Sequence, residues 1–363
     1  MEQNSENFNE VETTSVSTHQ CGSCGSQMKF DIEYGVLACG HCQTVKLIDN
    51  DDAIWRRELT DEIMRTHTLR TDGTVVRCQG CGSTEVLDRT AINKICNFCG
   101  NTSVVATEDL CGIQPDGIIP FTLDKAQIHQ MFANWMKSRP FAPGVFKRTD
   151  VRERLNPIYI PSWSFSAEAD GFYDGTLGRR VMRQTRNRHG QIITSSVIRY
   201  FRVNGVLRRH YTDYLIQSSK SISPINFKTL NPFSLGEVQP YRTDYLAGIP
   251  TEHYSRLLED CFKEFTEKIK RDIRRDVVRN HHADLVQTLS INLSFNKKKF
   301  NYILLPIYIA HYKYRGKTYN FYVNGTSGKI VGKYPVSFRK IGFLIFGVVA
   351  ALAGAVAAYY FLF

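Results

Sequence analysis

The feature that most constrains this chain is a repeated pattern of cysteine pairs near its start. There are four Cys-x-x-Cys pairs in two equal sets, and fourteen residues separate the pairs within each set. The members are Cys21, Cys24, Cys39 and Cys42 in the first set and Cys78, Cys81, Cys96 and Cys99 in the second. Two such turns supply four thiolates to a tetrahedral Zn²⁺ ion and leave no position open for water. The pattern therefore predicts two tandem zinc ribbons that hold two structural Zn²⁺ ions.

A second constraint is the uncharged stretch from Ile341 to Phe363. As a helix rising about 1.5 Å per residue, it is long enough to cross a hydrocarbon core of about 30 Å. A buried core helix is the alternative, but such a helix rarely lacks a polar face along its whole length. Arg339 and Lys340 precede the stretch, and the positive-inside rule then places the preceding residues in the cytoplasm. We expect a single-pass cell-membrane protein whose N-terminal domains are cytoplasmic.

The redox state of the cellular compartment decides whether paired cysteines form disulfides or bind metal. The N-terminus has neither the basic start nor the apolar stretch of a signal peptide. We therefore expect the cysteines to lie in a reducing compartment, where paired cysteines indicate metal ligands rather than disulfides.

Charge is sorted along the chain. Residues 1–110 carry 17 acidic and 9 basic side chains, whereas residues 111–363 carry 18 and 37. Residues 175–212 contain nine Arg and no acid, and residues 285–340 contain ten Lys and Arg and no acid. A phosphate backbone would be repelled by the acidic front, which favours protein partners for the ribbons. The basic part is suited to an anionic surface.

The basic part is expected to be α+β, with an antiparallel sheet. Apolar residues at helical spacing follow the GIIPF motif until Pro140, and residues 251–287 predict a long amphipathic helix that packs across the sheet. Strand-like alternation marks residues 159–165 and 300–337. The similar motifs IYIPSW and ILLPIY in these two blocks indicate a possible internal duplication.

Short Gly-containing motifs predict the turns of this sheet. They are Asp174-Gly175, 187–190 and Asn204-Gly205 in the first block, and Arg315-Gly316, Asn324-Gly325 and Ser327-Gly328 in the second.

These patterns together predict six units. They are a disordered N-terminus (1–18), zinc ribbon 1 (19–48), a helical linker (49–74), zinc ribbon 2 (75–110), the basic α+β domain (111–338) and a transmembrane anchor (339–363).

Several motifs occur in an order that points to a known family. After the paired ribbons come IIPF, Phe141-Ala142-Pro143, IYIPSWSF and NGTSGKIVGKYP. With these motifs the chain resembles bacterial TFIIB-type zinc-ribbon membrane proteins of the YdjG type, which are often labelled primosomal helicase-like. The resemblance implies a role in envelope-stress protection together with a partner membrane protein, an SPFH-like protein and PspA. No helicase motif accompanies it.

The sequence favours a non-catalytic membrane scaffold, whose basic domain lies on anionic lipid while its ribbons recruit proteins. The alternative is a membrane-tethered nucleic-acid-binding protein that uses the Arg-rich 175–212 segment, with Tyr200, Phe201 and Tyr211 available for stacking. A third reading is an ordinary solvated hairpin. The chain shows no phosphate-binding Gly loop, no His-Glu-x-x-His motif and no nucleophile elbow, so we do not expect an enzyme.

Overall fold

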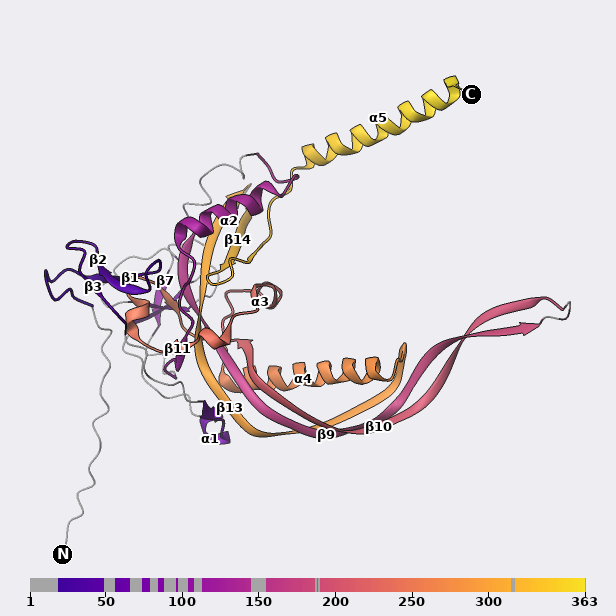
Figure 1. The fold of residues 1–363 in the computed structure, drawn as a ribbon, viewed down its shortest axis with the longest axis horizontal. Helices are drawn as coiled ribbons and strands as arrows, with labels where there is room; N and C mark the ends of the chain where they lie inside the picture. Colours follow the sequence, from indigo (N-terminus) through magenta and orange to yellow (C-terminus); the bar gives the residue numbers. More distant parts are fainter. Residues whose placement is uncertain are drawn as a thin grey trace, which may run out of the picture.

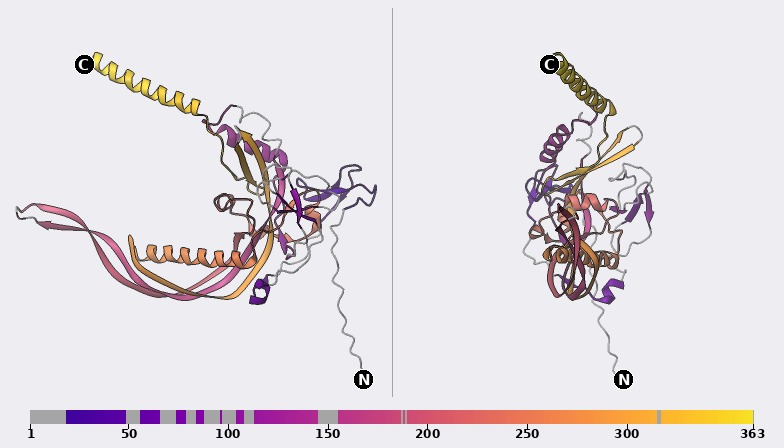
Figure 2. Two further views of the ribbon diagram at one scale, coloured as in Figure 1. Left: turned by 180° about the vertical axis from the view of Figure 1, so that it is seen from behind. Right: turned by 90° about the vertical axis from the view of Figure 1, so that its right-hand side faces the viewer.

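The structure is a computed structural model with a mixed α+β fold (Figure 1). It describes residues 19–48, 56–65, 74–78, 84–87, 96, 104–107, 113–144, 155–186, 188, 190–314 and 317–362. The predicted N-terminal segment 1–18 lies outside these residues. Two arms extend from one side of the body, and strands β1–β3 lie at the opposite side (Figure 1, Figure 2).

The strands form one small sheet and one large, mainly antiparallel sheet. The small sheet consists of β1 (Met28–Asp31), β2 (Val36–Cys39) and β3 (Val45–Lys46). The large sheet contains β4 (Arg57–Glu58), β5 (Thr74–Cys78), β6 (Thr84–Leu87), β7 (Val104–Thr107), β8 (Gly117–Ile118), β9 (Asn156–Arg186), β10 (Ile192–Gln217), β11 (Gln239–Pro240), β12 (Thr251–Glu252), β13 (Leu285–Tyr314), β14 (Lys317–Asn324) and β15 (Ile330–Gly332). Two pairings in it are parallel, namely β8 with β13 and β12 with β9.

The helices of the described residues are α1 (Asp61–Arg65), α2 (Lys125–Lys137), α3 (Pro224–Leu230), the 3₁₀ helices η3 (Leu235–Glu237) and η4 (Thr243–Leu246), α4 (Leu258–Asn280) and α5 (Phe338–Leu362). Among them α2, α4 and α5 are long and the others are short. The predicted helices before Pro140 and within 251–287 are confirmed as α2 and α4.

The core is built around the pairing of β9 with β13, which is buried on both faces. Successive side chains of a strand point to opposite faces, and accordingly Tyr159 and Trp163 belong to one apolar cluster while Ile158 and Ile160 belong to another. Helices α2 and α4 cover the first face, and α3 covers the second. The IYIPSW and ILLPIY motifs are neighbours in this ladder, where Tyr159 pairs with Pro306. An internal duplication stays a prediction.

The lower arm is formed by β9, β10 and β13 with α4 on its concave side (Figure 1). The helix buries a stripe at three- and four-residue spacing that includes Phe265, Ile269 and Ile273. Phe165 of β9 packs against Phe265 with ring centroids 5.5 Å apart. This apolar stripe confirms that the amphipathic helix packs across the sheet.

Two of the predicted turns are wrong. Asp174-Gly175 and Asn204-Gly205 lie inside β9 and β10, where Asp174 pairs with Asn204. A Cβ atom on Gly175 would lie 2.3 Å from the backbone oxygen of Thr288 in β13, so this glycine permits close approach of a neighbouring strand. The chain reverses instead between Arg186 of β9 and Ile192 of β10, which pair with each other, and Gly190 between them has a φ of 77°.

In the second strand block, the turns at Asn324-Gly325 and Ser327-Gly328 are confirmed, because they connect β14 to β15. The predicted turn at Arg315-Gly316 lies outside the described residues. Within the predicted helical linker (49–74), the described residues form β4, in which Arg57 and Glu58 pair with β13, and then α1.

Helix α5 forms the upper arm. It is long and apolar enough to cross a membrane, and none of its apolar window Phe338–Ala357 is buried against the rest of the protein. Its start is held to the body by Lys340, whose Nζ donates to the backbone oxygens of Pro140 and Ala142 at 3.2 and 2.7 Å. The structure therefore does not bury α5 as a core helix.

Candidate metal centre

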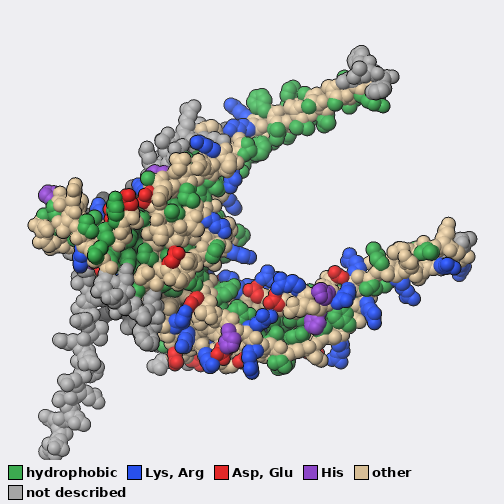
Figure 3. Space-filling model, viewed as in Figure 1, with side chains coloured by type: hydrophobic (Ala, Val, Ile, Leu, Met, Phe, Trp, Pro, Cys, Tyr) green, Lys and Arg blue, Asp and Glu red, His purple; other side chains and the backbone are tan. Residues whose placement is uncertain are grey.

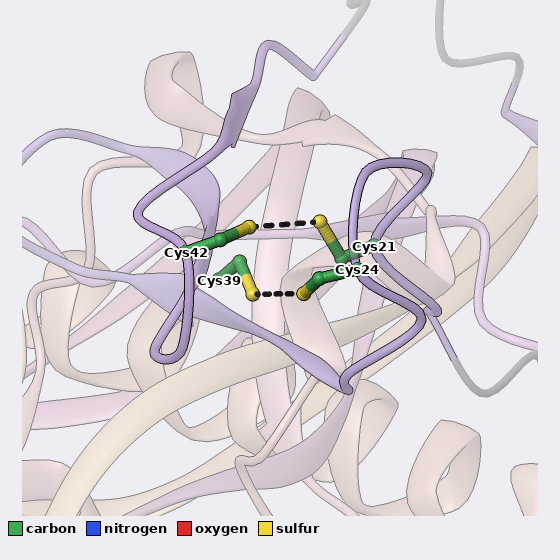
Figure 4. Close-up of side chains that lie close together, drawn as sticks. All are labelled: Cys21, Cys24, Cys39 and Cys42. Carbon is green, nitrogen blue, oxygen red and sulfur yellow. Dashed lines mark hydrogen bonds between the residues drawn. The ribbon is translucent and has the colours of Figure 1, made fainter.

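The first cysteine set converges into one cluster, drawn in Figure 4. The Sγ atoms of Cys21 and Cys42 lie 3.4 Å apart, and those of Cys24 and Cys39 lie 3.5 Å apart. All four Sγ atoms lie within 4.8 Å of one another. In a tetrahedron with Zn–S bonds of about 2.3 Å, neighbouring sulfurs are about 3.8 Å apart. The cluster therefore has the donor type, number and spacing that one tetrahedral Zn²⁺ ion needs.

Local backbone geometry explains how each Cys-x-x-Cys pair turns its two thiols the same way. The N–H of Gly25 donates to the oxygen of Cys21 at 2.8 Å, and that of Gln43 donates to the oxygen of Cys39 at 3.0 Å. Both turn-closing residues are left-handed, with φ of 73° at Gly25 and 60° at Gln43. Glycine adopts this conformation readily, whereas Gln43 adopts it against the usual steric preference.

The local electrostatics favour a thiolate at Cys21. Hydrogen bonds from the backbone of Ser23 and then of Cys24 lower the pKa of the Cys21 thiol to about 6. The Oγ1 atom of Thr44 lies 3.1 Å from the Sγ of Cys42 and donates to Ser23 Oγ at 3.2 Å. A thiolate is the form of cysteine that binds metal, and such outer hydrogen bonds orient the ligands. The site can thus act as a closed structural centre.

The cluster is packed onto the large domain. The N–H of Phe30 in β1 donates to the oxygen of Ala247 at 2.9 Å, and its ring meets that of Tyr245 edge-on with centroids 5.3 Å apart. Cys21, Cys39 and Leu37 belong to the same apolar cluster as the β9–β13 core. The cysteine cluster is therefore continuous with the main core, which its sequence spacing alone does not reveal.

The second cysteine set is only partly described. Cys78 ends β5 and is buried, and Cys96 is also buried. Both join the apolar cluster on the α3 face of the sheet. Cys81 and Cys99 lie outside the described residues, so the second zinc site remains a prediction.

The remaining described cysteine, Cys261, contrasts with the cluster. It is buried on α4, and burial raises the pKa of its thiol to about 12. It belongs to the buried stripe of α4, where it acts as a small apolar side chain.

The Arg-rich 175–212 segment contains a structural anchor that the sequence analysis missed. The guanidinium of Arg179 donates to the backbone oxygens of His281 and His282 at 2.6 and 2.9 Å. These oxygens lie just past the C-terminus of α4, where the helix dipole favours a cation. The carboxylate of Asp284 accepts from the N–H of Arg180 at 2.7 Å. One arginine of the segment thus fixes the hairpin to α4.

These features define a class of protein: a mixed α+β fold with a four-cysteine, metal-type cluster at one end and an exposed apolar C-terminal helix at the other. No family model matches the chain. It is 26% identical over 332 residues to the uncharacterized protein YdjG of Bacillus subtilis (strain 168), an alignment that covers 90% of this chain and 92% of that protein. No solved structure matches it. The similarity agrees with the YdjG-type resemblance and spans nearly the whole length of both chains.

Proposed function

We propose that this protein is a non-catalytic, membrane-anchored adaptor. In this proposal α5 crosses the cell membrane once, residues 1–340 lie in the cytoplasm, and two zinc ribbons present a surface to partner proteins. The zinc ions stabilise the ribbons and take part in no reaction, because four cysteines leave no open coordination position.

The observation that carries the proposal is the exposure of α5. Within it, Phe343 is 77% exposed and Phe346 73%, and no charged residue follows Lys340. In water, this continuous apolar surface would cost a large hydrophobic free energy. A bilayer removes that cost along the whole helix. The basic residues Arg339 and Lys340 at its start support the cytoplasmic orientation.

The partner surface is supported by the position and composition of the small sheet. Strands β1–β3 lie at the side of the body away from α5 (Figure 1). Their outer surface exposes Tyr34, Val45 and Leu47 at 72%, 57% and 78%. Apolar and aromatic side chains displayed beside a rigid metal cluster are suited to binding protein. They would face the cytoplasm when α5 is in the bilayer.

The resemblance to YdjG-type proteins supplies the partners that we propose to test. They are another membrane protein, an SPFH-like protein and PspA, acting in a membrane or envelope stress system. Their recruitment would depend on the folded first ribbon, while membrane attachment would depend on α5.

A crosslinked pull-down from membranes tests this proposal. The intact protein is compared with a double variant, Cys21→Ser with Cys24→Ser, and with the control Cys261→Ala, which removes a thiol outside the cluster. We expect stress-response partners with the intact and control proteins and their loss with the double variant. Unchanged recovery with the double variant would refute ribbon-dependent recruitment, and recovery of nucleic acid instead would favour the nucleic-acid alternative.

A further inference from the structure

Among the residues that the structure describes, no third strand pairs with the outer part of the β9–β10 hairpin. The pairing of β13 with β9 ends where Leu285 meets Gly178. Beyond this point β9 and β10 continue alone, from the pair Arg179–Arg199 to the pair Arg186–Ile192. We call residues 179–199 the distal ribbon. A two-stranded ribbon is marginally stable by itself in water, so its length calls for a surface that stabilises it.

Both faces of the distal ribbon expose aliphatic side chains. Met182, Ile192 and Ile198 share one face, where they are 76%, 61% and 42% exposed. Ile193 lies on the other face and is 49% exposed. The hydrophobic effect opposes the contact of these side chains with water.

The same ribbon is strongly cationic. Arg180, Arg183, Arg186 and Arg199 are exposed, and none of them forms an ion pair with an acidic side chain in the described part of the chain. No Asp or Glu occurs between residues 175 and 212. Arg179, by contrast, is held by α4. Four exposed cations beside aliphatic side chains match a surface that is both anionic and partly apolar.

The architecture selects lipid as that surface. The distal ribbon and α5 extend from the same side of the body, as Figures 1 and 2 show, and the space-filling view in Figure 3 shows Lys and Arg side chains gathered along the hollow between them. A bilayer that takes up α5 therefore stands on the side toward which the ribbon extends.

The side-chain types also favour lipid over nucleic acid. Nucleic-acid binders without sequence preference stack bases on aromatic rings. Within residues 179–199 the exposed apolar side chains are Met and Ile. Of the two rings that follow, Tyr200 is 52% exposed, and the ring of Phe201 is covered by the Arg179 guanidinium, 5.6 Å from its centroid. Aliphatic side chains partition into the interfacial layer, while arginine side chains extend their charged groups to the phosphates.

We propose that the distal ribbon is a second membrane contact, which inserts Met182, Ile192 and Ile198, the aliphatic side chains of one face, into the interfacial layer of an anionic leaflet beside the α5 anchor. The inference rests on the proposed membrane span. In this arrangement the distal ribbon holds the lower arm, including α4, at the membrane surface.

Photocrosslinking of the full-length protein in lipid nanodiscs tests the contact. A benzophenone amino acid replaces Met182 in one variant and Tyr34 in a matched control, because these side chains are 76% and 72% exposed. The discs contain either phosphatidylcholine alone or phosphatidylcholine with phosphatidylglycerol. In anionic discs, we expect at least a fivefold excess of lipid adducts at position 182 over position 34. We also expect a several-fold reduction when Arg180, Arg183, Arg186 and Arg199 are all replaced by Gln.

The other outcomes overturn the inference in separate ways. Equal lipid labelling at positions 182 and 34 would show that the ribbon stays in solution. Adducts between two copies of the chain would identify an oligomer contact, and adducts to added RNA or DNA in place of lipid would identify a nucleic-acid surface. Failure of the full-length protein to enter discs at all would overturn the membrane span, and this inference with it.

Discussion

Replacing Cys39 by serine should open the small sheet and leave the large domain folded. Cys39 is buried at the end of β2, and its Sγ lies 3.5 Å from that of Cys24. The substitution removes one of four thiolates and keeps nearly the same side-chain volume. Because residues 19–48 form a unit of the size that normally needs a metal or disulfides to fold, loss of the ion should remove its main support.

The magnitude follows from the side chains that the small sheet buries. Met28, Phe30 and Leu37 are all less than 10% exposed. Each contributes about 1.5–3 kcal/mol when buried, so opening the sheet gives up about 5–9 kcal/mol. Structural zinc sites add apparent binding free energies of about 10–16 kcal/mol in small peptides. If the free energy needed to open the small sheet falls by about 4 kcal/mol, amide hydrogen exchange in that sheet becomes about a thousandfold faster.

Two measurements on the purified full-length protein check this expectation. Elemental analysis should show one metal ion fewer per chain in Cys39→Ser, and no loss in Cys261→Ala. Hydrogen exchange should accelerate about a thousandfold or more at the amides of β1 and β2, including the N–H of Phe30 that donates to Ala247. The amides of α4 should keep their protection.

The reasoning would be refuted by a Cys39→Ser protein that retains its full metal content. Unchanged exchange at Phe30 after metal loss would refute it in another way, because the small sheet would then be held by apolar contacts alone. Loss of protection in α4 as well would show that the metal centre supports the whole fold rather than one unit.

Four further outcomes are expected. Deletion of residues 339–363 should move the protein from the membrane fraction to the soluble fraction after a high-salt wash, which releases contacts that depend on charge, such as that of the distal ribbon. Retention after this wash would contradict α5 as the membrane-spanning anchor. Gly175→Ala should lower the free energy of unfolding by about 2–3 kcal/mol in a denaturant titration, because its Cβ would meet a β13 carbonyl oxygen at 2.3 Å. The control Gly236→Ala should change the free energy of unfolding by less than about 1 kcal/mol, because a Cβ on Gly236 meets nothing within 4 Å. Ile269→Ala should cost about 2–5 kcal/mol in the same titration, because this side chain is fully buried between α4 and the sheet. Burial lowers the pKa of His253, so stability should fall as the pH drops below about 6.5, and His253→Phe should flatten the fall in Tm between about pH 7 and pH 5.

The sign of the His253 effect follows from linkage. An imidazole whose pKa is lower in the folded than in the unfolded protein binds its proton more readily after unfolding. Acid therefore favours the unfolded state, in the window from the ordinary pKa down to the folded one. Metal binding by cysteine thiolates also weakens in acid. The comparison is therefore made between His253→Phe and the unsubstituted protein at each pH.

The sequence by itself determined the features that depend on local spacing. Equal Cys-x-x-Cys spacing placed the first four thiols in one cluster, because two short turns of that type bring pairs of Sγ atoms together whatever surrounds them. The uncharged run from Ile341 determined α5, and the apolar repeat containing Phe265 and Ile269 determined α4. Helices have a strong period of 3.6 residues, so these segments were found without knowledge of their partners.

Only the tertiary structure decided the long-range features. Asp174-Gly175 has the composition of a turn, yet it lies inside β9, because β13 passes so close that no side chain fits there. The docking of Phe30 on Ala247 and of Arg179 on the end of α4 joins residues far apart in the chain. Such contacts depend on how strands cross and curve, which local spacing does not encode. The arrangement that places α5 and the Arg-rich hairpin on one side, and the cysteine cluster on the other, follows from that packing.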